Sequence, residues 1–150
     1  MTVKDICNRN VVVAPKTEMI VDAAKRMRTS HVGALVVVDN RNGRHVPIGI
    51  VTDRDIVVSG LAGDPEHLVH LLVSDLMRWD LVTARDSDTV DDALKKMQEG
   101  GIRRLPIVDA TGELVGILTL DDVLQYLTAQ QSDLVALVAK EQRHERTYRL

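Results

Sequence analysis

The chain has 150 residues, of which 45% are hydrophobic and 27% are charged, so it can bury one domain or two small halves that share a core. A net charge of -3 and only three aromatic residues give no basis for nucleic-acid binding, which we do not expect. The single cysteine, Cys7, excludes an internal disulfide and a thiolate metal cluster. No apolar run approaches the roughly 18 residues of a membrane span. Residues 1–6 carry a charge pair where a signal peptide is apolar, so we expect no membrane association and a cytoplasmic location.

The first half of the chain predicts strand, helix, strand, tight turn, strand and helix. Apolar strands are expected at 11–13, 34–38 and 48–51, and residues 19–29 carry apolar positions spaced for one face of a helix. A second helix is expected from Thr52 to about Leu61. A connector helix is then expected over residues 66–72, after the Asp64-Pro65 start signal.

The second half predicts the same order of elements. Thr89 and Asp92 have the spacing of a capping box at the start of a helix. Apolar strands are expected at 105–108 and 115–118. The last helix is predicted to be long, with a possible break at 130–132 and a polar tail, 140–150, that is frayed or solvated.

The two halves are a sequence repeat. A shift of 70 residues superposes 3–6 on 73–76 and 20–27 on 90–97. After a longer turn in the first unit, Gly49-Ile50-Val51-Thr52 realigns with Gly116-Ile117-Leu118-Thr119. The predicted fold is α+β: two βαββα repeats packed sheet to sheet as a pseudo-two-fold pair. The predicted divisions are repeat one at 1–62, a connector helix at 63–72, repeat two at 73–128, and a C-terminal helix and polar tail at 129–150.

Each repeat ends its last strand in a Thr-x-x-Asp corner, formed by Thr52 and Asp55 in the first and by Thr119 and Asp122 in the second. One interpretation is a helix capping box, which stabilises by about 1 kcal/mol. The other is a ligand site, because a helix N-terminus suits a phosphate and a carboxylate can accept both hydroxyls of a ribose. A glycine three positions before each threonine favours the second interpretation, since a ligand that approaches the backbone closely needs one there.

These residues resemble the cystathionine-β-synthase-type (CBS) domain family. The resemblance rests on Gly49–Asp55, Gly116–Asp122 and Arg103–Asp109, and it covers essentially residues 3–128. It implies a tandem pair, or Bateman module, that acts in regulation and signal transduction, binds an adenosine-containing ligand such as AMP, ADP, ATP, NAD or S-adenosylmethionine, and forms a homodimer. It implies no catalytic activity and no catalytic cofactor.

The resemblance also implies that each ligand site is shared between the repeats. Asp55 and Asp122 would bind ribose, and Thr52 and Thr119 would lie on the phosphate side. The first site would comprise Thr52, Arg54, Asp55, Val82, Ile102, Arg103 and Arg104. The second would comprise Thr119, Asp122, Val12, His31, Val32 and Gly33.

The two sites differ in charge. The first gathers Arg54, Arg103 and Arg104, whose guanidinium groups match phosphate geometry. The second has Asp121 at the position of Arg54, and His31 is its one basic candidate. We therefore expect a phosphorylated nucleotide at the first site. The second is expected to bind more weakly, to bind a less charged ligand or to stay empty.

Two other function classes remain as alternatives. A CBS protein that has kept the fold but lost the ligand would act in interaction or scaffolding. An enzyme acting on nucleotides is disfavoured, because the sequence has no P-loop and no nucleophile–base pair. No metal site is expected, since His67 and His70 lack an evident third ligand, and any regulatory output would pass through the dimer or an unidentified effector protein.

Overall fold

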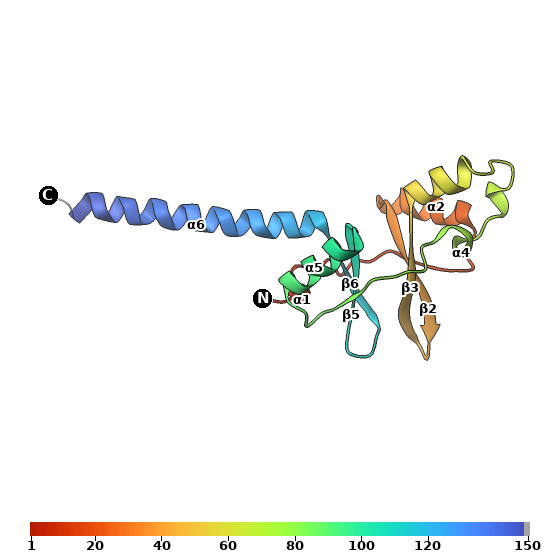
Figure 1. Ribbon diagram of the computed structural model, residues 1–150, viewed down its shortest axis with the longest axis horizontal. Coiled ribbons are helices and arrows are strands. Elements are labelled where there is room, and N and C mark those ends of the chain that lie inside the picture. Colours follow the sequence, from red (N-terminus) through yellow and green to blue (C-terminus); the bar gives the residue numbers. More distant parts are fainter. Residues whose placement is uncertain (149–150) are drawn as a thin grey trace.

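The computed structural model describes residues 1–148 and contains two three-stranded sheets (Figure 1). The strands of the first sheet are β1 (Val13–Pro15), β2 (Ala34–Arg41) and β3 (Arg44–Thr52). Those of the second are β4 (Ala84–Arg85), β5 (Arg104–Val108) and β6 (Leu114–Thr119). In each sheet the first strand pairs parallel and the third antiparallel with the middle strand, and a bulge follows Val37 in one and Ile107 in the other. The mixed α+β repeat predicted from the sequence is confirmed.

A helix follows the first strand of each repeat. Helices α2 (Ile20–Ser30) and α5 (Val90–Gly100) bury their apolar stripes and end in left-handed residues, His31 and Gly101. Short helix α3 (Asp53–Asp55) continues as the π-helical turn η1 (Ile56–Leu61), and α6 (Leu120–Tyr148) follows the second repeat. These bounds agree with the predicted order of elements.

Three details of the helices differ from the sequence expectations. The predicted connector helix is a single 3-10 turn, η2 (Leu68–His70), so the helix expected over 66–72 is too long. Helix α6 runs without a break at 130–132, because glutamine is a good helix former and the polar side chains there are exposed to solvent. The tail is helical through Tyr148 rather than frayed, and residues 149–150 lie outside the described part of the chain.

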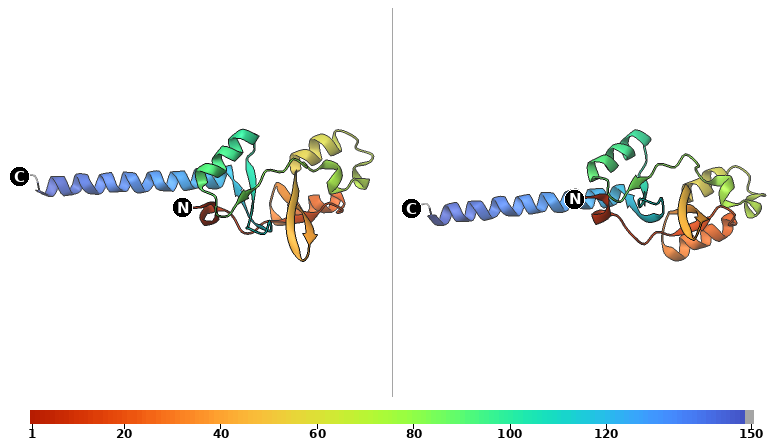
Figure 2. Two further views of the ribbon diagram at one scale, coloured as in Figure 1. Left: turned by 60° about the horizontal axis from the view of Figure 1, so that its bottom comes forward. Right: turned by 90° about the horizontal axis from the view of Figure 1, so that it is seen from below.

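Each repeat contributes its first helix to the hydrophobic core of the other repeat. Helix α1 (Val3–Ile6) places Val3 in the core formed by the second repeat, beside Leu105 and Leu118. Helix α4 (Val73–Leu76) places Val73 in the core of the first repeat. The two repeats therefore cover each other's sheets through swapped segments as well as through the contacts of β3 with β6 (Figure 2).

The second residue after each exchanged helix adds a short bridge to the outer strand of a sheet. Arg78 exchanges two backbone hydrogen bonds with Ile50 of β3, at 2.8 and 3.2 Å. Asn8 does the same with Ile117 of β6, at 2.9 Å each. These bridges cap the otherwise open edge of each sheet.

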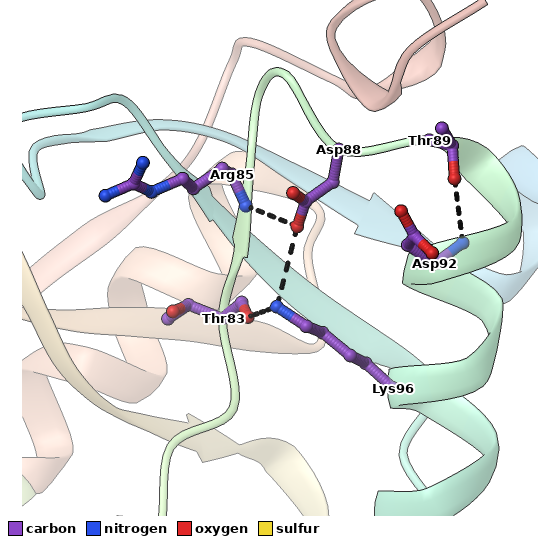
Figure 3. A network of polar contacts seen from close by, with 6 residues as sticks. All are labelled: Thr83, Arg85, Asp88, Thr89, Asp92 and Lys96. Carbon is purple, nitrogen blue, oxygen red and sulfur yellow. Dashed lines mark hydrogen bonds and ion pairs between the residues drawn. The ribbon is translucent and has the colours of Figure 1, made fainter.

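A polar network fixes the chain that enters α5 (Figure 3). The Lys96 ammonium donates to the Thr83 carbonyl at 3.0 Å and lies 3.5 Å from the Asp88 carboxylate. The same carboxylate accepts from the Arg85 backbone N–H, and the Thr89 hydroxyl accepts from Asp92 at 3.1 Å. The first repeat has an ion pair at the equivalent positions, between Arg26 and Glu18. The network fixes the segment between Val82 and the start of α5.

Candidate functional site

Both Thr-x-x-Asp corners form capping boxes. The Asp55 backbone N–H donates to the Thr52 hydroxyl at 3.2 Å, and the Thr52 N–H donates to an Asp55 carboxylate oxygen at 3.0 Å. Asp122 and Thr119 make the same two bonds at the same distances. The capping interpretation therefore holds at both corners. It leaves the second oxygen of each carboxylate outside the box.

The glycine before each corner is explained by the exchanged segments, which corrects the sequence interpretation. A Cβ on Gly49 would lie 2.5 Å from the Arg78 carbonyl oxygen. A Cβ on Gly116 would lie 2.8 Å from Cys7 Sγ and 3.0 Å from the Asn8 carbonyl oxygen. Contacts this short exclude a side chain, so the protein's own backbone, and not a ligand, requires these glycines.

A cavity of about 370 Å³ lies between the repeats at the first corner. It is lined from the first repeat by the end of β3 and the start of α3, and from the second by the segment before β4 and the turn before β5. The lining residues are Ile50, Thr52, Asp53, Arg54, Arg78, Asp80, Leu81, Val82, Gly100, Gly101, Ile102, Arg103 and Arg104. Six of the seven residues predicted for the first site thus line one cavity: Thr52, Arg54, Val82, Ile102, Arg103 and Arg104.

Asp55, the seventh residue of the predicted first site, lies beside the lining rather than in it. Its side chain is largely buried, and its Oδ1 lies 3.8 Å from Nε of Arg78, a lining residue. One oxygen of Asp55 therefore serves the capping box and the other faces a cavity arginine.

The side chains that line the cavity carry a net positive charge. Four arginines and two aspartates line it, and its aliphatic residues are Ile50, Leu81, Val82 and Ile102. A flat apolar group and an anionic group can therefore both be accommodated in it.

Arg78 and Asp80 were not predicted from the sequence. They reach the cavity because α4 crosses to the first repeat and the chain then returns along β3. Their position four and two residues before Val82, which was predicted, is the one signal that could have identified them.

The residues predicted for the second corner lie apart from this cavity lining. Val12 and Val32 pack against the core of the first repeat. His31 is exposed and takes the left-handed position after α2. A Cβ on Gly33 would lie 3.1 Å from Asp53 Oδ2 and 3.6 Å from Arg104 Nη2, so Gly33 adjoins two residues that line the cavity. A shared second site around Thr119 and Asp122 stays a prediction.

In each repeat, a backbone hydrogen bond joins the turn before the middle strand to the start of the helix at the corner. The Arg103 carbonyl accepts from Leu120 N–H at 2.9 Å, at the start of α6, while Arg103 also lines the cavity at the first corner. The Gly33 carbonyl accepts from Asp53 N–H at 2.9 Å, at the start of α3. The turn before each middle strand therefore holds the helix start of its own repeat. In the second repeat, that turn also faces the cavity shared with the first.

His67 pairs with Asp64 at 2.6 Å. Within residues 1–148, no group of three or more His, Cys, Asp or Glu side chains is placed to hold a metal ion. Among the described helices, none combines the length and the apolarity needed to cross a membrane.

Comparison with known proteins identifies the family. The CBS domain model matches residues 3–60 and 73–129. An uncharacterized protein of Methanopyrus kandleri, MK0525, is 36% identical over 132 residues, which are 86% of this chain and 65% of that protein, so the chain spans less than two thirds of this relative.

Solved structures of CBS pairs have the same fold. The structure of CBSX2, a CBS-pair protein from Arabidopsis thaliana, in complex with AMP superposes with a TM-score of 0.73 at 30% identity, over 87% of this chain and 98% of that one. The CBS domain pair of MJ0100, in complex with 5'-methylthioadenosine and S-adenosyl-L-methionine, superposes with a TM-score of 0.73 at 26% identity, over the same shares of the two chains. This protein belongs to the CBS domain family, as a pair of CBS repeats.

Proposed function

We propose that this protein is a non-enzymatic regulatory module that binds a phosphorylated, adenosine-containing ligand in the cavity between its repeats and signals through a homodimer. The observation that carries the proposal is the cavity itself. It joins aliphatic walls, four arginines and the N-terminal turn of α3 in one space of about 370 Å³.

Each part of the proposed ligand has a matching group. An adenine ring would pack between aliphatic side chains such as Val82 and Ile102, which line the same cavity. Phosphate oxygens would accept hydrogen bonds from Arg54 and Arg103, whose donors suit them. The Asp55 oxygen that faces Arg78 lies outside the capping box, and a ribose hydroxyl would donate to it.

The relatives support the ligand class but not a single ligand. One CBS pair was solved with AMP and another with 5'-methylthioadenosine and S-adenosyl-L-methionine, all of which contain adenosine. The four arginines of this cavity favour a ligand with phosphate groups over S-adenosylmethionine, which carries a sulfonium cation. We therefore place AMP, ADP, ATP and NAD ahead of S-adenosylmethionine.

A panel of ligands tests the proposal by thermal unfolding. Binding at one hundred times the dissociation constant adds about 2.7 kcal/mol to the free energy of unfolding. AMP, ADP, ATP, NAD and S-adenosylmethionine would be compared at equal concentration. We expect a stabilising shift from at least one phosphorylated ligand, with unaltered ligand recovered afterwards. No shift with any of the five would favour the scaffolding alternative, and conversion of a nucleotide would favour an enzyme.

A matched pair of arginine variants would test whether the ligand binds in the cavity. Arg103→Ala removes a cavity guanidinium, whereas Arg85→Ala removes one from an exposed residue outside the lining. A hydrogen bond to a charged group is worth about 1.5–3 kcal/mol, so Arg103→Ala should weaken binding roughly 10- to 100-fold. Arg85→Ala should leave the affinity unchanged. Titration followed by the fluorescence of Trp79, the neighbour of lining residues Arg78 and Asp80, would measure both.

A further inference from the structure

Helix α6 projects far beyond the domain that it leaves. Its first turns pack on α1 and β6, and Val123 is buried in the second core. The whole helix has 29 residues and is about 43 Å long. Beyond its first turns it extends away from both sheets (Figures 1 and 2). Large apolar side chains on it are exposed by half or more of their surface: Leu134 by 64%, Val135 by 62%, Leu137 by 54% and Val138 by 52%.

The exposed apolar residues form a stripe with coiled-coil spacing. Leu124, Leu127, Gln131, Leu134 and Val138 follow one another at alternating intervals of three and four residues. A shallow hollow lies along the same face, lined by Gln131, Leu134, Val135, Val138, Ala139 and Gln142. Helices in proteins draw most of their stability from packing of an amphipathic face, and an exposed apolar stripe of this kind marks an interaction surface.

The charges on α6 show which partner fits the stripe. Residues 120–139 contain three aspartates and no lysine or arginine, whereas 140–146 contain Lys140, Arg143 and Arg146. The stripe itself ends in Glu141 and Glu145. In a parallel pair, each of these glutamates would face its own copy, which is destabilising. An antiparallel pair avoids that repulsion and brings the basic end of one helix to the acidic start of the other.

We infer that α6 pairs with α6 of a second copy of this chain, antiparallel and along the stripe. We choose the alignment in which the largest number of apolar stripe residues face each other beyond the folded domain. It sets Leu127 beside the partner's Val138 and Gln131 beside the partner's Leu134. The partner's Arg146 then lies near Asp121. Gln131 is the single polar residue within the apolar part of the stripe, and such a residue fixes the register of a helix pair.

This inference rests on the homodimer part of the proposed function, and its experiment uses no nucleotide. Single cysteines would be introduced in a Cys7→Ala background, with Cys7→Ser as a second background and circular dichroism as the check on folding. The variants are Leu127→Cys and Val138→Cys on the stripe, and Ala136→Cys on the opposite face of the helix. One variant of each mixture is isotope-labelled, and mass spectrometry after mild oxidation identifies the linked pairs.

The inference predicts a disulfide mainly between unlike chains when Leu127→Cys and Val138→Cys are mixed. Like chains should link poorly, because two equivalent positions on the stripe would then be about 16 Å apart, beyond the reach of a disulfide. Linked dimers of Val138→Cys alone at the level of the mixture would show parallel pairing and overturn the inference. Equal linking of Ala136→Cys would show random collision and overturn it as well.

Native mass spectrometry of the unlinked protein separates this inference from the wider proposal. A dimer mass with no disulfide in the mixed sample would overturn the pairing of α6 and leave a homodimer formed elsewhere. A monomer mass would contradict both. Nucleotide binding, measured in the thermal panel, is unaffected by either result.

Discussion

The glycine before each corner is required by contacts with a segment of the other repeat. Gly49 and Gly116 precede the two corners by the same interval and meet the chain after α4 and α1, respectively. The repeat pattern shows that both glycines matter, but it cannot show what they touch. A contact with Arg78 or Cys7 depends on the exchange of helices, which has no local signal in the sequence.

Alanine at Gly49 should destabilise the protein strongly. Its Cβ would lie 2.5 Å from the carbonyl oxygen of Arg78, and the Arg78 backbone cannot move away easily because it exchanges two hydrogen bonds with Ile50. We expect a loss of about 2 kcal/mol or more in the free energy of unfolding in urea, since overpacking costs about 1–3 kcal/mol. Gly100→Ala is the control, because its Cβ would find only ordinary contacts of 3.5 Å or more at the end of α5. Equal stability of Gly49→Ala and Gly100→Ala would show that the exchanged segment is not packed as described.

The Cys7 thiol should react slowly in the native protein. Burial raises the pKa of the Cys7 thiol, with Arg9 opposing the shift weakly, so a smaller fraction is thiolate at mildly alkaline pH. Alkylation by iodoacetamide, followed by mass spectrometry, should reach half its limiting rate at a higher pH in the folded chain than in the chain unfolded by urea. A native midpoint at or below that of the unfolded chain would contradict the partly buried position of Cys7.

At the scale of elements, local patterns predict most of the structure. The order of the strands, both long helices of the repeats and both capping boxes follow from apolar periodicity and from Thr-x-x-Asp spacing, although β1 lies at Val13–Pro15 and not at 11–13. The predicted connector helix over 66–72 is wrong because Asp64-Pro65 signals a start but no apolar stripe follows to stabilise a helix. The possible break predicted at 130–132 is absent because glutamine is a good helix former, so polar residues there do not end a helix.

The capping box at the start of α6 gives a prediction about one element. Thr119→Ala removes the hydroxyl that accepts from Asp122 N–H at 3.2 Å. We expect a loss of about 1 kcal/mol in the free energy of unfolding, measured in urea. Thr119→Ser keeps the acceptor and should lie within a few tenths of a kcal/mol of the parent protein. If serine and alanine were equally destabilising, the threonine methyl group rather than the cap would carry the effect.

At the scale of the whole molecule, the cavity depends on the pairing of the repeats. The resemblance to CBS domains led to six of its lining residues, but Arg78 and Asp80 required the path of the chain after α4. These two residues add one positive and one negative charge at the first corner, so they leave the difference in net charge between the corners unchanged. Asn8 and Asn10 of the first repeat stand at the positions that correspond to Arg78 and Asp80 of the second.

The charge difference predicts unequal ligand sites. The first corner has four arginines in its cavity, whereas Asp121 replaces Arg54 at the second and adds a negative charge beside Asp122. A phosphorylated ligand is attracted by the first set and repelled by the second. We therefore expect one strong nucleotide site per chain, at Asp55.

Titration calorimetry with the nucleotide that stabilises most in the thermal panel tests this claim most directly. Asp55→Asn and Asp122→Asn are the matched variants, because asparagine keeps an oxygen to accept from the cap N–H and loses the charge. The account predicts one strong site per chain, weakened roughly tenfold or more by Asp55→Asn and unchanged by Asp122→Asn. Two equal sites per chain, or binding that is indifferent to Asp55→Asn, would contradict it.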